Sequence, residues 1–199
     1  MSSSTGKPLP VLVVTGQSGA GKGTLIQRLL AAFPQLELAV SATTRARRPG
    51  EEDGVHYYFI SDEEFDRRLA ADEFLEYHAF PWGQRSGTLV SEITRIVDDG
   101  RACVLELETE GALAVAEREP NAVTIFVTAP IEELERRLRE RATESAGEIS
   151  ERIRVAREQL LVADRFSYVV ENDDLERALG ELSTIVRGLL APAGTMSRP

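Results

Sequence analysis

The chain has 199 residues and a formal net charge of −10, with 42% hydrophobic and 28% charged residues. A chain of this length can bury one sizeable core, and its apolar runs are too short to cross a bilayer, so we expect a single domain that does not enter a membrane. The acidic balance also disfavours sequence-independent binding to nucleic acid or to an acidic membrane surface. Any anionic ligand must therefore meet locally concentrated arginine.

The first predicted elements are a strand, a glycine-rich turn and a helix. Residues 11–15 form a continuous apolar run rich in valine, which is typical of a strand buried on both faces. Apolar residues then recur at helical spacing from Leu25 to Phe33, and Pro34 ends the segment. The turn at 16–24 therefore joins a buried strand to a helix.

The rest of the chain alternates in the same way. We expect strands at 55–60, 103–107, 123–127 and 168–170. We expect helices after a capping box at 61–64, from Leu89 to Gly100, and over 110–119, 131–138, 149–161 and 175–190. Strands that alternate with helices imply a parallel sheet with helices on both faces and ligands at the carboxyl ends of the strands.

The two chain ends indicate which residues are expected to be disordered, and the single cysteine indicates the cellular compartment. Residues 1–10 do not resemble a secretory signal, and we expect both 1–10 and 191–199 to be disordered. Cys103 lies in an apolar run, where packing is a better interpretation than catalysis. A single cysteine forms no internal disulfide, which fits the reducing cytoplasm, where we expect the protein.

The turn TGQSGAGKGTL predicts a phosphate-binding loop. Gly16, Gly19 and Gly21 allow positive φ angles and direct backbone N–H groups toward an anion at the start of a helix, and Lys22 adds a positive charge for the β and γ phosphates. The spacing and the strand-turn-helix context are those that the motif requires. Gly23 replaces the hydroxyl residue that helps to hold magnesium, so we expect Thr24 or ordered water in that role.

Two groups of arginines stand out against the acidic background. They are Arg45, Arg47 and Arg48 in one segment, and Arg136, Arg137, Arg139 and Arg141 in another. The second group also fits a solvated helix face, because residues four apart lie on one side of a helix.

An ordered set of motifs resembles the guanylate kinase family. These motifs are the phosphate loop, S-x-T-T-R-x-x-R-x-G-E at 41–51, FLEY at 74–77, LELETEGA at 105–112, RLRERATES at 137–145 and ENDDL at 171–175. The resemblance implies an α/β fold of three layers, the P-loop kinase fold, over 11–190. It also implies a core of 11–40 and 100–190 with a central parallel sheet, an inserted acceptor-binding subdomain at about 41–99 and a helical lid at about 137–152.

The resemblance implies that the chain transfers the γ-phosphoryl group of ATP to GMP, and also to dGMP, with Mg²⁺. The residues implied for ATP are Gly16, Gln17, Ser18, Gly19, Ala20, Gly21, Lys22, Gly23, Thr24 and Asn172. Those implied for GMP are Ser41, Arg45, Arg48, Glu51, Tyr57, Glu76, Ser86, Thr88 and Glu108. Catalysis is implied for Lys22, Arg45, Arg137, Arg141 and Arg152, and a metal role, through water, for Thr24 and Glu108.

The chemistry of these residue types suits such substrates. Planar guanidinium groups bind a doubly charged phosphate in bidentate fashion, which fits Arg45 and Arg48. Guanine offers an N–H beside an amino group, so one carboxylate, Glu76, can accept both hydrogen bonds. The alternative for Glu76 is an exposed carboxylate at a helix end.

Four positions depart from the family pattern. Ser86 stands where the family has a tyrosine that contacts the acceptor phosphate, Glu108 where it has aspartate, and Glu110 where it has glutamine. Ala142 replaces a glycine of the lid. Two other functions therefore stay open, a kinase with an altered acceptor and a guanylate-kinase-like binding module without catalysis, although the intact Lys22 favours an enzyme. The sequence does not predict an oligomeric state.

Overall fold

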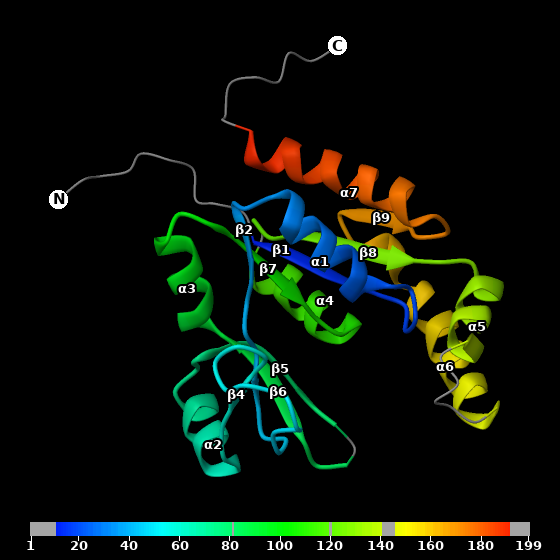
Figure 1. Cartoon of the computed structure of the whole chain (residues 1–199). Helices are drawn as coiled ribbons and strands as arrows, with labels where there is room; N and C mark the ends of the chain where they lie inside the picture. The colour runs from blue at the N-terminus through cyan, green and yellow to red at the C-terminus, as the bar shows by residue number, and fades with distance from the viewer. Residues whose placement is uncertain (1–10, 81, 120, 141–145, 192–199) are drawn as a thin grey trace.

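The computed structural model describes residues 11–80, 82–119, 121–140 and 146–191. The disorder expected of 1–10 and 191–199 falls outside these ranges, apart from Ala191, which caps the last helix. In chain order the elements (Figure 1) are β1 (Leu12–Gly16), α1 (Lys22–Ala32), β2 (Leu36–Leu38), β3 (Ala42–Thr43), β4 (Tyr58–Phe59), α2 (Asp62–Ala70), β5 (Phe74–Ala79), β6 (Arg85–Leu89), α3 (Val90–Asp98), β7 (Ala102–Glu106), α4 (Thr109–Arg118), β8 (Val123–Thr128), α5 (Ile131–Glu140), α6 (Ala146–Leu160), the short 3₁₀ helix η1 (Ala163–Arg165), β9 (Tyr168–Glu171) and α7 (Leu175–Leu190). None of the helices within the described ranges has both the length and the apolar character needed to cross a membrane.

Five strands form a parallel sheet in the order β2-β7-β1-β8-β9. β1 lies between β7 and β8, and all of its residues are buried. Leu12 and Val14 pack on one face of the sheet, whereas Val13 packs on the other. Because both faces of this strand are covered, its sequence is apolar throughout and does not alternate with polar residues.

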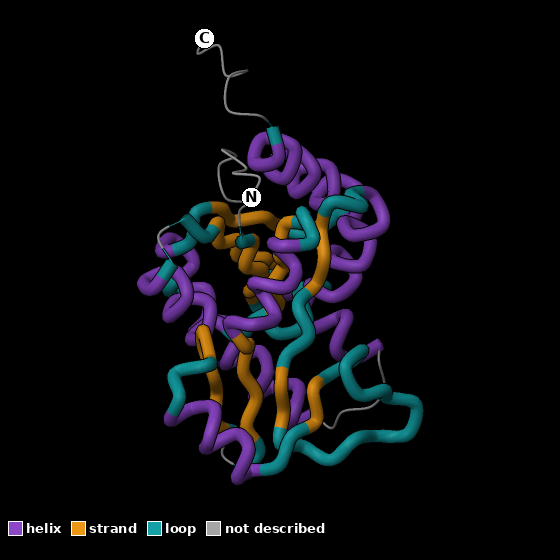
Figure 2. Tube along the Cα trace, turned by 90° about the vertical axis from the view of Figure 1, so that its left-hand side faces the viewer, coloured by secondary structure: helices purple, strands orange, loops and turns teal. Residues whose placement is uncertain are grey.

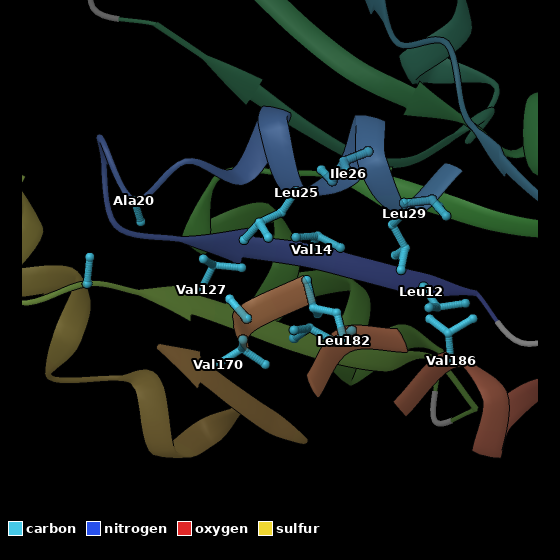
Figure 3. Packing of buried hydrophobic residues seen from close by; sticks show 14 of the residues in the cluster. Leu12, Val14, Ala20, Leu25, Ile26, Leu29, Val127, Val170, Leu182 and Val186 are labelled. Carbon is cyan, nitrogen blue, oxygen red and sulfur yellow. The ribbon is translucent and has the colours of Figure 1, made fainter. Parts of the chain in front are cut away.

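Helices cover both faces of this sheet, which gives the three-layer α/β fold that the sequence predicts (Figure 1). On one face, Leu25 of α1 and Leu182 of α7 pack in one cluster with Val14 (Figure 3). On the other face, Val115 of α4 packs with Cys103 of β7. Burial raises the pKa of the Cys103 thiol to about 12, so this cysteine serves packing.

Four strands form a second, mixed sheet in the order β4-β3-β6-β5. In Figure 2 this sheet lies below the central one, with α2 beside it. It has a small core of its own, in which the rings of Phe65 and Phe74 stack with centroids 4.4 Å apart, next to Ala42 and Leu89. The second sheet therefore has a core of its own, while Leu75 of β5 packs into the core of the central sheet.

The structure differs from the sequence prediction mainly in this second sheet. The strands β2, β3, β5 and β6 are absent from the prediction, and the strand expected at 55–60 is reduced to β4 because residues 54–56 form a turn. The helix expected from Leu89 starts one residue later, since Leu89 ends β6. β5 and β6 carry polar residues such as Glu76 and Ser86 that line a cleft, so the apolar alternation typical of a strand is lost.

Candidate active site

The phosphate-binding loop connects β1 to α1, as the glycine spacing predicts. Gly16, Gly19 and Gly21 have φ angles of 140°, 88° and 84°, which residues with side chains rarely adopt. A Cβ on Gly16 would lie 1.9 Å from the carbonyl oxygen of Val127. A Cβ on Gly21 would lie 2.7 Å from Nδ2 of Asn172. Glycine is therefore required at both positions, and the loop leads into a helix N-terminus that favours anions.

Lys22 is the first residue of α1, and its ammonium group folds back over the loop. Nζ donates hydrogen bonds to the carbonyl oxygens of Gly16 at 2.9 Å and of Gln17 at 3.2 Å. Burial lowers the pKa of Lys22, while the charges of Glu108 and Glu106 act in the opposite direction. A half-buried cation held by neutral carbonyl groups gains a stronger partner when a phosphate enters the loop.

Gln17 has a structural side chain, so any contact with ATP comes from its backbone. Its Oε1 accepts hydrogen bonds from Thr128 Oγ1 at 2.6 Å and from the amide of Ala129 at 2.9 Å. Its Nε2 donates to the carbonyl oxygen of Ala156 at 3.0 Å. The fully buried carboxamide thus fastens the loop to the end of β8 and to α6.

Two arginines of the predicted lid reach the phosphate loop or its neighbours. Arg137 of α5 donates to the carbonyl oxygen of Asn172 at 2.8 Å. Arg152 of α6 donates to Oγ of Ser18 in the loop at 3.4 Å. The third predicted arginine, Arg141, lies outside the described residues. Both described arginines are therefore placed beside the loop, as a role in charge neutralisation requires.

Two cavities, of ≈ 300 Å³ and ≈ 330 Å³, open on opposite sides of this loop. The cavity on the side of α5 and α7 measures ≈ 330 Å³ and is lined by Gly19, Gly21, Thr24, Arg137, Glu140, Asn172 and Leu175. Within it, Asn172 is buried and donates Nδ2 to the carbonyl oxygen of Ala20 at 2.7 Å. The exposed Gly23 meets no neighbour, and Thr24 supplies the hydroxyl on this side.

The second cavity, of ≈ 300 Å³, lies between the phosphate loop and the four-stranded sheet. It is lined by Lys22, Ser41, Tyr57, Glu76, His78, Phe80, Ser86, Gly87, Glu106, Leu107, Glu108 and Gly111. Lys22 of α1 and Glu76 of β5 in the second sheet line the same space. We call this cavity the acceptor cleft.

Glu76 lies in β5 and is buried, so the alternative of an exposed carboxylate at a helix end is wrong. Its Oε1 accepts hydrogen bonds from the amide of Thr88 at 3.0 Å and from Oγ1 of Thr88 at 2.8 Å. A Cβ on Gly111 would lie 2.8 Å from Oε2, so glycine leaves room for the carboxylate. Burial raises the pKa of Glu76, and the two hydrogen bonds from Thr88 oppose that shift.

Arg45, Glu51 and Tyr57 form one group beside the cleft. Both terminal nitrogens of Arg45 donate to the carboxylate of Glu51 at 2.8 Å, and its guanidinium carbon lies 5.1 Å from the centroid of the Tyr57 ring. Arg48 contributes its backbone N–H, which donates to Glu51 at 2.8 Å. The hydrogen bonds from Arg45 and Arg48 lower the pKa of Glu51 to about 2. Glu51 therefore orients Arg45, while Tyr57 lines the cleft itself.

The predicted hydroxyl residues have different partners. Ser41 and Ser86 line the cleft, and Oγ of Ser86 donates to the carbonyl oxygen of Ala42 at 3.0 Å. The hydroxyl of Thr88 is bonded to Glu76, so Thr88 fixes the orientation of the carboxylate.

Sequence reasoning missed six residues that line the cleft, namely His78, Phe80, Gly87, Glu106, Leu107 and Gly111. Glu106 is the last residue of β7, the strand next to β1. A carboxylate at the end of this strand is the usual acidic partner of a phosphate loop. Its position at the end of an apolar run could therefore have identified Glu106 as a site residue. Glu106 is exposed to the cleft, yet the surrounding protein desolvates its carboxylate and raises its pKa, against the charge of Lys22. The rings of His78 and Phe80 pack at an interplanar angle of 75° with centroids 4.7 Å apart, a contact that no local sequence pattern predicts.

Comparisons with known proteins agree with this geometry. The sequence model of guanylate kinase matches residues 9–189. A guanylate kinase of Symbiobacterium thermophilum is 45% identical over 177 residues, covering 88% of this chain and 83% of the relative. One of Rubrobacter xylanophilus is 45% identical over 182 residues, covering 91% and 95%. The crystal structure of guanylate kinase from Anaplasma phagocytophilum superposes with a TM-score of 0.71 at 29% identity, covering 92% of this chain and 87% of that one. The chain therefore belongs to the guanylate kinase family.

Proposed function

We propose that the protein transfers the γ-phosphoryl group of ATP to GMP, and also to dGMP, giving ADP and the nucleoside diphosphate. The observation that carries this proposal is the pair of Lys22 and Glu76 in one cleft. Lys22 belongs to a loop built for phosphates, and Glu76 is a buried carboxylate suited to guanine. Membership of the guanylate kinase family supports the same reaction.

Guanine recognition rests on the carboxylate of Glu76. Oε1 is already hydrogen-bonded to Thr88, and within the described residues Oε2 accepts no hydrogen bond. An ionised carboxylate accepts from the adjacent N–H and amino groups of guanine, whereas adenine has no such pair. Because Thr88 fixes the carboxylate before the substrate arrives, little side-chain entropy is lost on binding.

The acceptor phosphate is held by Arg45, Arg48 and Tyr57. Arg45 is oriented by Glu51 and by the ring of Tyr57, which lines the cleft. Transfer of a phosphoryl group requires that its acceptor oxygen point at the γ phosphate, and a preformed arginine favours that alignment.

The donor phosphates bind at the phosphate loop. Backbone N–H groups between Gly16 and Thr24 surround the β phosphate, and Lys22 exchanges its carbonyl partners for phosphate oxygens. Arg137 and Arg152 neutralise the charge that develops on the transferred group, together with Arg141. No covalent phosphoenzyme is required, because positioning and charge neutralisation account for catalysis of this type.

The residues near the loop also suit the Mg²⁺ ion that accompanies ATP. Glu106 and Glu108 line the cleft, and the charge of Glu108 raises the pKa of Glu106 further, so the pair favours a nearby cation. Glu106 and Glu108 in the acceptor cleft and Thr24 in the other cavity would supply hard oxygen ligands, directly or through water. When bound, the metal neutralises charge on the β and γ phosphates.

The proposal includes the division of the chain. We place the acceptor-binding subdomain at about 41–99, within a core of 11–40 and 100–190, and the lid at about 137–152. A lid that carries Arg137 and Arg152 closes over ATP and excludes water. The single, buried Cys103 agrees with a cytoplasmic location.

The test is the release of ADP from ATP and Mg²⁺ in the presence of GMP, dGMP, AMP, UMP or CMP. We expect turnover with GMP and dGMP. Turnover confined to another acceptor would show that Ser86, Glu108 and Glu110 have changed the acceptor. An absence of turnover with every acceptor would favour the binding-module alternative.

A further inference from the structure

Glu92 is a buried carboxylate that takes no part in the mechanism described above. It lies in the first turn of α3, outside both nucleotide cavities, and only 3% of its surface is exposed. Oε1 accepts from the amide of Val40 at 3.1 Å and from Nη2 of Arg95 at 2.8 Å. Oε2 accepts from the hydroxyl of Tyr58 at 3.0 Å and from Nε of Arg95 at 3.0 Å. Both oxygens therefore have two donors each.

The donors come from both parts of the molecule. Val40 lies on the segment that leaves the central sheet after β2 and enters the second sheet at β3. α3, which carries Glu92 itself, is the path back from β6 to β7 (Figure 1). Tyr58 belongs to β4 of the second sheet, and Arg95 also binds Glu37 of β2 in the central sheet at 2.7 Å. One carboxylate thus joins the outgoing segment, the returning helix and the second sheet.

The same carboxylate is close in sequence to two walls of the acceptor site. Tyr58 directly follows Tyr57, which lines the acceptor cleft. Thr88, which holds Glu76, stands four residues before Glu92 at the end of β6. A shift of Glu92 relative to Val40 would therefore displace both the phosphate side and the base side of the acceptor site.

A buried charge with four donors fixes geometry strongly. A carboxylate that lost one of these donors would stay buried with a group unpaired, so the arrangement in which all four bonds form is favoured over other angles between the sheets. A cavity of ≈ 380 Å³ borders Tyr58, Glu92 and Arg95, which gives water access to the partners in a variant that lacks the carboxylate. We therefore expect such a variant to fold.

We propose that Glu92 is a positioning residue that sets the angle of the acceptor-binding sheet against the phosphate loop. It lines neither nucleotide cavity, and its effect reaches the substrate through Tyr57 and Thr88. This inference rests on the proposed function, because it concerns the binding of GMP. One side chain thus fixes how the two connections between the sheets, the segment after β2 and helix α3, lie relative to each other.

The experiment compares Glu92→Ala, Glu92→Gln and Tyr58→Phe with the parent in steady-state kinetics for GMP and for ATP. Loss of a hydrogen-bonded charge that orients a site costs about tenfold or more, so we expect Glu92→Ala to raise the KM for GMP roughly tenfold and to leave the KM for ATP within about twofold. Glu92→Gln keeps one acceptor oxygen and Tyr58→Phe removes one donor, so both should fall between the parent and Glu92→Ala.

The matched control is Glu64→Ala. Glu64 also accepts from two arginines of α2, Arg67 and Arg68, and these pair with Glu73 just before β5, so within the described residues no bond of this group reaches the central sheet. We expect its KM values to equal those of the parent. Thermal melting of every variant separates a loss of folded protein, which lowers the apparent kcat without changing either KM, from a change in acceptor binding.

Several results would overturn the inference. An unchanged KM for GMP in folded Glu92→Ala would do so, as would an equal rise in both KM values. If Glu92→Ala does not fold, unchanged KM values in Glu92→Gln and Tyr58→Phe decide against it. A parent protein that does not phosphorylate GMP would defeat the proposed function and this inference together, whereas the first results leave the proposed function intact.

Discussion

Glu76 and Thr88 face each other across the β5–β6 pair, and one oxygen of the carboxylate accepts both the amide N–H and the hydroxyl of the threonine, at 3.0 Å and 2.8 Å. The other oxygen is left for the ligand. A buried carboxylate is costly to maintain, so a chain that keeps it in this orientation sacrifices stability for recognition.

This relationship predicts that Glu76→Gln is more thermostable than the parent at neutral pH. The pKa of Glu76 is raised in the folded state, so its favourable contribution to folding exists below the pKa of the unfolded chain and is lost as pH rises through the folded value. Gln is neutral at every pH and avoids that loss. Melting curves from pH 7 down to about pH 4, near the ordinary value for glutamate, should show the difference in Tm shrinking. A variant that melts lower than the parent at pH 7 would count against this account.

The same shift predicts how acceptor binding depends on pH. Glu76 must be ionised to accept two hydrogen bonds from guanine, so the KM for GMP should rise as pH falls through its raised pKa, at a pH above the ordinary range of glutamate. The phosphate of GMP also titrates, near pH 6. Glu76→Gln shares the phosphate titration and lacks that of the carboxylate, so it is the control. Identical pH profiles of KM for the parent and Glu76→Gln would refute the prediction.

Lys22 should serve the nucleotide and contribute little to the fold. Its ammonium group is bonded to two loop carbonyls, and burial lowers its pKa. We expect Lys22→Ala to abolish measurable turnover and to keep a cooperative thermal transition at a Tm no lower than that of the parent. Circular dichroism melting and ADP release measure the two effects. Retained turnover would remove Lys22 from the mechanism.

Ser86 lies where the resemblance to the guanylate kinase family predicts a tyrosine. Its hydroxyl is bonded to the backbone of Ala42 in the cleft wall, and we expect a tyrosine side chain at this position to reach the acceptor phosphate. A hydrogen bond to a charged group contributes about 1.5–3 kcal/mol, so Ser86→Tyr should lower the KM for GMP roughly tenfold or more. An unchanged or higher KM in steady-state assays would contradict this.

Most strands of the central sheet could be predicted from the sequence, because the patterns that identify them lie within a few neighbouring residues. β1 is a buried run followed by glycines at fixed spacing, and these features do not depend on distant residues. β5 and β6 gave no such signal, because Glu76, His78 and Ser86 serve the cleft at positions where an apolar residue would identify a strand.

Motif resemblance located Lys22 and Glu76, but it did not reveal what holds them in place. The partners of Gln17 are 111 and 139 residues away, in β8 and α6, so no local pattern indicates that its side chain is structural. The burial of Glu92 could not be predicted from the sequence either, because a glutamate on a helix is usually exposed. Only the three-dimensional arrangement shows that both side chains are buried and hydrogen-bonded to distant residues.

The ratio of kcat/KM for GMP to that for AMP, in the parent and in Glu76→Gln, tests the account most directly. A site built from polar groups rejects an analogue that lacks the partner by a factor of about 10⁴ to 10⁵, so we expect the parent to prefer GMP by several orders of magnitude. Glu76→Gln should lose most of this preference while it still phosphorylates GMP slowly. A ratio that is the same in both proteins, or a parent that does not distinguish the two nucleotides, would contradict the assignment of Glu76 and the choice of GMP as the acceptor.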